Sequence, residues 1–200
     1  MKDFFVHLKR RWYIYVAVAI VIIPLLLFIL DAVTKPTKEQ KVSMFLSCYS
    51  CNEELSVRIN ENLPDGIREF DLGDFSQDET FYASYFNTYG KDADLVVLSQ
   101  KYSDMCSCDS YFIELEEERV KARYGDNVEF YYYEGKAYGI KVFDKETKSG
   151  MASNEIQYCK EGEEENSYLF FGKGSKHLGD FVNNSNDDAA LKILDMLWQN

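Results

Sequence analysis

The residues whose types and spacing could do chemistry are the five cysteines of this 200-residue chain. Cys48 and Cys51 form a CxxC pair, Cys106 and Cys108 form a CxC pair, and Cys159 stands apart. A CxxC pair at the start of a helix is typical of a redox-active dithiol, because the helix N-terminus lowers the pKa of a thiol. The two pairs together also provide enough thiols for a zinc site, and a third interpretation is structural disulfides. Since five is an odd number, we expect Cys159 to be the cysteine left over.

Signatures of other chemistry are weak. His177 is the one histidine that follows the long apolar segment, and a satisfied surface histidine is a more ordinary interpretation of it than a catalytic base. The acidic run 160–165 lacks the alternating ligands and the glycine of an EF-hand loop. Residues 172–175 lack the spacing of a P-loop. Our main prediction therefore contains no catalytic residue, no metal and no cofactor.

Charge and composition narrow the class of protein. The chain has 34 acidic and 22 basic residues, and its formal net charge of −12 argues against nucleic acid as a partner, because nucleic-acid binders need a basic surface. Hydrophobic residues make up 46% of the chain and charged residues 28%, so we expect a packed core rather than disorder.

The longest apolar segment, Trp12–Leu30, contains no charged residue and is long enough to cross a bilayer, which takes about 20 residues. A signal peptide is the alternative, but Leu30-Asp31-Ala32 is a poor cleavage site. Basic residues before the segment favour a cytoplasmic N-terminus. We therefore predict four regions: a cytoplasmic tail (1–11), a single-pass membrane anchor (12–30), a linker (31–40) and an extracytoplasmic domain (41–200).

Residues 41–200 show the alternation of strands and helices that is typical of an α/β domain. The first three predicted strands are 41–47, 67–72 and 93–98, with a helical pattern between each two. The continuous apolar run in the third is typical of a strand in a parallel sheet that is covered on both faces. The expected fold is thus a single three-layer α/β domain with a mainly parallel sheet, completed by a hairpin over 128–143, a strand at 168–172 and a helix at 187–198.

Several of these segments, taken together, carry a family resemblance. KVSMFLS (41–47), ADLVVLS (93–99), GKAYGIKVF (135–143) and YLFFGKGSKHLG (168–179), which runs on into DDAALKILDML (187–197), resemble segments of the extracellular solute-binding proteins of bacterial ABC transporters, with the type II periplasmic-binding fold. Members of that family have a whole second lobe after the strand that GKAYGIKVF resembles. In this chain only residues 144–167 separate the end of that strand, Phe143, from the next strand. The resemblance therefore implies one lobe, with the second absent or vestigial.

The sheet of that family also implies where the site residues lie. Its first and third strands are neighbours, so the two cysteine clusters would meet at the carboxyl edge of the sheet, and we predict that Cys48 or Cys51 forms a disulfide with Cys106 or Cys108. Ligands of open α/β sheets bind beyond this edge. The predicted ligand-binding residues are those that follow the first and third strands: Tyr49, Ser50, Ser99 and Tyr102.

The function that follows is a membrane-anchored, extracytoplasmic binding domain without catalysis. We expect it to bind a protein, a peptide or a small solute in a transport or sensing system, with an envelope protein or transporter as partner. The alternative is a membrane-tethered, thioredoxin-like thiol-disulfide oxidoreductase that uses Cys48 and Cys51. That class places a cis-proline against its redox pair, and this sequence has no proline after Pro64.

Overall fold

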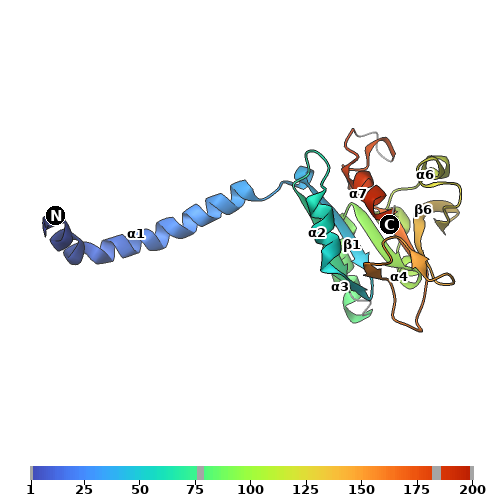
Figure 1. Ribbon diagram of the computed structural model, residues 1–200, viewed down its shortest axis with the longest axis horizontal. Coiled ribbons are helices and arrows are strands. Elements are labelled where there is room, and N and C mark those ends of the chain that lie inside the picture. Colours follow the sequence, from blue (N-terminus) through green and yellow to red (C-terminus); the bar gives the residue numbers. More distant parts are fainter. Residues whose placement is uncertain (1, 76–78, 182–185, 199–200) are drawn as a thin grey trace. The chain divides into compact units, whose positions relative to one another are not determined.

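The computed structural model describes residues 2–75, 79–181 and 186–198 of a chain that forms two compact units, Met1–Thr37 and Lys38–Asn200 (Figure 1). The first unit consists of helix α1 (Lys2–Thr34), whose backbone leaves helical geometry at Arg11 and which contains Pro24. Within Arg11–Thr34, an 18-residue window has a mean hydropathy of 3.0, and none of that window is buried. The predicted N-terminal apolar helix is confirmed, with the length and apolarity of a membrane span or a signal sequence.

The second unit is built on one large sheet with the strand order β3-β1-β4-β9-β6-β5, in which β7 also pairs with β6 (Figure 1). A separate two-stranded sheet joins β2 to β8. The strands are β1 (Lys41–Ser47), β2 (Ser50–Cys51), β3 (Glu69–Phe75), β4 (Leu95–Ser99), β5 (Phe130–Tyr133), β6 (Lys136–Asp144), β7 (Ser149–Gly150), β8 (Ile156–Gln157) and β9 (Ser167–Phe171).

The predicted α/β class is confirmed, but the sheet is mixed rather than mainly parallel. β1 pairs in parallel with β3 and with β4, and helices connect these strands. β9 is antiparallel to β4 and β6, and β6 is antiparallel to β5. The connections explain the difference, because a parallel pairing needs a long crossover. A tight turn at Glu134 and Gly135, both with positive φ, joins β5 to β6, and residues 145–166 lead from β6 to β9 without a helix.

Helices cover both faces of the sheet and create two hydrophobic cores. In the first core, α2, α6 and α7 pack on the face that includes Val42 and Val97. In the second core, α3, α4 and α5 pack on the opposite face, which includes Phe45 and Val96. The helices and 3-10 turns are η1 (Lys38–Gln40), α2 (Glu53–Glu61), α3 (Glu79–Thr88), η2 (Gly90–Asp92), α4 (Gln100–Met105), α5 (Cys108–Tyr111), α6 (Glu117–Tyr124), η3 (Gly179–Phe181) and α7 (Ala189–Trp198).

The outer edge of the sheet at β3 is covered in part by one side chain of α2. The Asn60 amide nitrogen Nδ2 donates to the carbonyl of Phe70 at 3.0 Å, and the Phe70 N–H donates to Asn60 Oδ1 at 2.9 Å. This reciprocal pair imitates the two hydrogen bonds that a neighbouring strand would make. The amide side chain therefore closes the strand edge at Phe70.

Candidate functional site

The two cysteine pairs lie in different cores of the domain. Cys48 belongs to the first core, whereas Cys106 and Cys108 belong to the second, with the sheet between them. All five cysteines of the chain are free thiols. The predicted disulfide between the pairs is therefore not formed, because the sheet separates the partners. Among the described residues, no group of three or more histidine, cysteine or acidic side chains is arranged to hold a metal ion.

The surroundings of the CxxC pair keep its thiols protonated. Burial, followed by the nearby Cys51 and Asp74, raises the pKa of Cys48 to about 12. Burial, followed by Asp74 and Glu155, raises the pKa of Cys51 to about 11. Helix α2 starts after the pair, and Asn52 is its N-cap, accepting the N–H of Glu54 at 3.0 Å. Burial and nearby carboxylates are the opposite of the electropositive surroundings that activate a redox thiol. The geometry therefore does not favour the oxidoreductase alternative.

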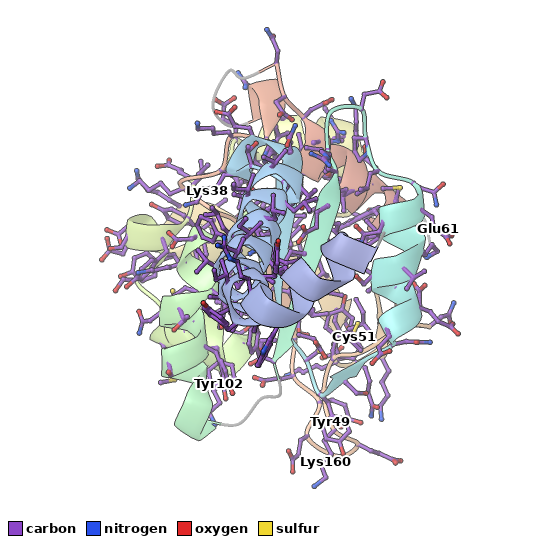
Figure 2. All side chains as sticks on the ribbon, turned by 90° about the vertical axis from the view of Figure 1, so that its left-hand side faces the viewer. Lys38, Tyr49, Cys51, Glu61, Tyr102 and Lys160 are labelled. Atoms are coloured by element: carbon purple, nitrogen blue, oxygen red, sulfur yellow. The ribbon has the colours of Figure 1, made fainter. Side chains whose placement is uncertain are left out.

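The four predicted ligand-binding residues do not form one surface. Tyr49 is half exposed and Ser50 is exposed, but Ser99 and Tyr102 are almost completely buried. Figure 2 shows Tyr49 and Tyr102 apart from each other, with Tyr49 at the end of the domain where Lys160 lies.

Ser99 ends the central strand β4 and Tyr102 packs in the second core, which explains their burial. A separate feature of this edge is the segment that follows β6. Residues 145–166 return over the carboxyl edge of the sheet, and β8 in this segment pairs with β2. Arg58 of α2 fastens it through two hydrogen bonds to Glu155, of 2.9 and 2.6 Å. At its end, Asn166 accepts the N–H of Gln100 at 2.7 Å. The segment thus stands where the resemblance implies a second lobe, and β8 pairs with the strand that contains Ser50.

A groove of about 510 Å³ lies at the same edge of the sheet, but next to β6. Phe143 of β6 and Ser99 of β4 both stand opposite Ser167 of β9, so the carboxyl ends of β6 and β4 lie at one edge. The lining residues come from β6, β7, the segment before β5, and the ends of α6 and α7: Tyr124, Asn127, Val128, Glu129, Lys141, Val142, Phe143, Asp144, Ser149, Gly150, Met151 and Trp198. The volume is in the range of small-molecule sites.

Two aromatic side chains form one wall of this groove. The rings of Tyr124 and Trp198 lie 4.8 Å apart between centroids. Arg123 fixes this wall, because its Nε and Nη2 bind the two carboxylate oxygens of Asp195 at 3.1 and 2.6 Å and so join α6 to α7. Val142 and Met151 supply buried apolar surface beside the wall.

The charged part of the groove is a lysine between two carboxylates. The Lys141 ammonium lies 2.5 Å from Glu129 Oε2 and 2.6 Å from Asp144 Oδ2, and its side chain is only 12% exposed. Burial lowers the pKa of Lys141, but the two carboxylates outweigh burial and the net shift is upward. Lys141 and the backbone N–H groups of Thr147 and Glu146 hold the pKa of Asp144 far below its usual range.

His177 is buried and does not have the contacts of a catalytic base. Its Nδ1 lies 2.8 Å from Asp187 Oδ2, and its Nε2 lies 3.2 Å from the carbonyl oxygen of Lys38. Both partners are hydrogen-bond acceptors, an arrangement that favours the doubly protonated imidazolium, and the pKa of His177 is raised. The hydroxyl of Ser175 donates to Asp94 at 2.6 Å. The expectation of a surface histidine is wrong, because the ring joins η1 to the start of α7.

Sequence reasoning did not find the groove residues. The predicted hairpin contains Lys141 and the predicted last helix contains Trp198, but no motif connects them. The apolar residues on one face of the predicted last helix, which end at Trp198, predict core packing and do not indicate a cavity. A search of family models, of curated proteins and of solved structures finds no match to this chain. The resemblance to solute-binding proteins therefore stays a prediction.

Proposed function

We propose that this chain is a membrane-anchored, extracytoplasmic binding domain that holds a segment of a partner protein or peptide in the groove next to β6. The observation that carries the proposal is the groove itself, which lies at the edge where open α/β sheets bind ligands and has a fixed aromatic wall. The family resemblance supports the same edge. A ligand carried by a tethered domain fits a role in transport or sensing.

The anchor is supported by the apolar helix and the charges before it. The segment Arg11–Thr34 is long enough to span the bilayer. Lys2, Lys9, Arg10 and Arg11 precede the apolar residues and favour a cytoplasmic N-terminus by the positive-inside rule. Residues 41–200 then lie outside the cytoplasm.

A binding role is favoured over catalysis by the state of the reactive side chains. Cys48 and Cys51 stay protonated at neutral pH because of their raised pKa values. Both imidazole nitrogens of His177 are occupied by acceptors. A protein or peptide segment is favoured over a free solute because the groove is open on one side, and residues 145–166 are too short to form a second lobe that encloses a solute.

The anchor is tested by protease protection and mass spectrometry. Protease added to intact cells should digest the domain, and the membrane-bound chain should retain residues 12–30. A domain that is protected until the membrane is opened would show that the orientation is wrong. A mature chain that begins after Leu30 would show a cleaved signal peptide instead of an anchor.

The groove is tested by site-specific photocrosslinking in the full chain. A photoreactive residue at Ser149, an exposed position in the groove lining, should give an adduct of one mass. The same residue at the exposed Lys160, outside that lining, is the matched control and should give none. Trp198→Ala should weaken the Ser149 adduct, with resistance to limited proteolysis as the check on folding. Equal adducts at both positions, or none at Ser149, would refute the groove as the binding site.

A further inference from the structure

The charges that line the groove are arranged with the cation inside and carboxylates outside. Lys141 is 12% exposed and is bound by both Glu129 and Asp144, whereas the Glu129 side chain is 67% exposed. Glu129 binds Lys141 through its Oε2. Two carboxylates against one ammonium leave the lining with a net negative charge, and the low pKa of Asp144 keeps that carboxylate ionised.

The aromatic wall next to these carboxylates suits a cation as well. Arg123 already lies over the ring of Tyr124 at 5.9 Å while it is paired with Asp195. Lys121 lies over a neighbouring ring of this region, Phe130, at 5.5 Å while it is paired with Glu117. A cation held between a ring face and a carboxylate is thus a repeated arrangement here. Trp198, the best ring type for such a contact, lines the groove.

We infer that the groove takes a primary ammonium or guanidinium group on a short apolar stem, as in a lysine or arginine side chain of the bound segment. The cation pairs with Glu129, and the stem lies along the aromatic and apolar wall. This inference rests on the proposed function and names the chemistry of its ligand. A carboxylate ligand fits worse, because it must displace Glu129 or Asp144 from Lys141 and approach a domain with excess negative charge.

The test uses the fluorescence of Trp198 in the full chain in nonionic detergent. The chain has two tryptophans, so Trp12→Phe leaves Trp198 as the single reporter. Three probes of equal length are titrated at constant ionic strength: n-butylammonium, n-butanol and n-butyrate. We expect a saturable change with n-butylammonium and affinities at least about tenfold weaker for the other two.

A matched pair of variants tests the role of Glu129. Glu129→Gln should weaken n-butylammonium binding roughly fivefold or more, because it removes the carboxylate and keeps the shape of the side chain. Glu163→Gln, at an acid outside the groove lining whose side chain is 71% exposed, should leave the affinity unchanged. Equal losses in both variants would mean a general effect of net charge and would overturn the specific pairing.

The outcomes test the chemistry of the ligand separately from the location of the binding site. Saturable binding of n-butyrate but not of n-butylammonium would overturn the cationic ligand and keep the groove as a binding site. Equal binding of n-butanol and n-butylammonium would show that only apolar contact matters, which also overturns the cationic ligand. No saturable response to any of the three probes would count against both the ligand chemistry and the proposed groove.

Discussion

Replacing His177 by glutamine should remove a buried charge that joins the two ends of the second unit. The imidazole side chain is 3% exposed and donates to Asp187 and to the Lys38 carbonyl. Burial lowers the pKa of His177, but the hydrogen bonds to Asp187 and Lys38 and the charges of Asp187 and Asp94 outweigh burial, and the net shift is upward. The folded state therefore binds this proton more tightly than the unfolded state does.

The sign of the pH dependence follows from this raised pKa. The stabilisation by His177 is fully present below the unfolded pKa of about 6.5 and is lost as the pH rises through the folded pKa. In this window the free energy of unfolding falls by at most about 1.4 kcal/mol per pH unit. Each hydrogen bond to a charged group contributes about 1.5–3 kcal/mol, and water replaces part of the one at the half-exposed Asp187. We expect His177→Gln to lose about 2–4 kcal/mol at pH 6 and clearly less at pH 9.

The assay is urea denaturation of the full chain carrying Trp12→Phe, in nonionic detergent, followed by Trp198 fluorescence at pH 6, 7.5 and 9. Lys176→Gln is the control, because Lys176 is the exposed neighbour that pairs with Glu39. It should change the free energy of unfolding by less than about 1 kcal/mol at each pH. If the parent and His177→Gln differ by the same amount at pH 6 and pH 9, the imidazole is not charged in the folded state and the reasoning fails.

Three further predictions test other parts of the structure. Alkylation of Cys51 by iodoacetamide at pH 8 should be roughly 100-fold slower than that of a free cysteine, because the pKa of Cys51 is raised to about 11. Peptide mass spectrometry measures the rate, and alkylation at the rate of a free cysteine would contradict the raised pKa. Arg58→Met should lower the free energy of unfolding by about 1–3 kcal/mol, because the two hydrogen bonds to Glu155 are lost. In urea denaturation, Glu155→Gln should show an equal loss. Gly172→Ala should prevent normal folding, since its Cβ would lie 2.0 Å from the Ala93 carbonyl oxygen, and a thermal melting temperature equal to that of the parent would contradict this packing.

The elements of this fold were largely predictable because their periodicities are strong. β1 and α2 lie where the sequence places a strand and a helix, and Leu55 and Ile59, four residues apart, are buried on one face of α2. The apolar run before Ser99 is buried on both faces. The direction of β9 could not be read in this way, because a buried strand shows the same apolar pattern in parallel and antiparallel pairing.

The site was harder to predict because it depends on which face of the sheet each residue meets. Cys48 continues the alternation of β1 that places Val42 and Met44 in the first core, whereas Cys106 follows α4 on the other face. Beyond the end of a strand, the spacing of residues in the sequence no longer indicates on which face of the sheet a residue lies. The burial of Tyr102 depends in turn on the second core, which gathers residues from β1, β4, β6 and β9 that are distant in the sequence.

On the proposed membrane anchor, the side chain of Asn60 has a consequence for how neighbouring copies of this protein meet. A tether confines neighbours to two dimensions, which raises their effective concentration and makes encounters between sheet edges frequent. An open edge at β3 would let one copy extend the sheet of the next, and such growth has no natural end point. In each copy the Asn60 side-chain amide already binds the backbone N–H and carbonyl of Phe70, so these two groups are not available to the strand of a neighbouring copy. On the proposed membrane anchor, this filled position disfavours sheet extension between neighbouring copies at Phe70.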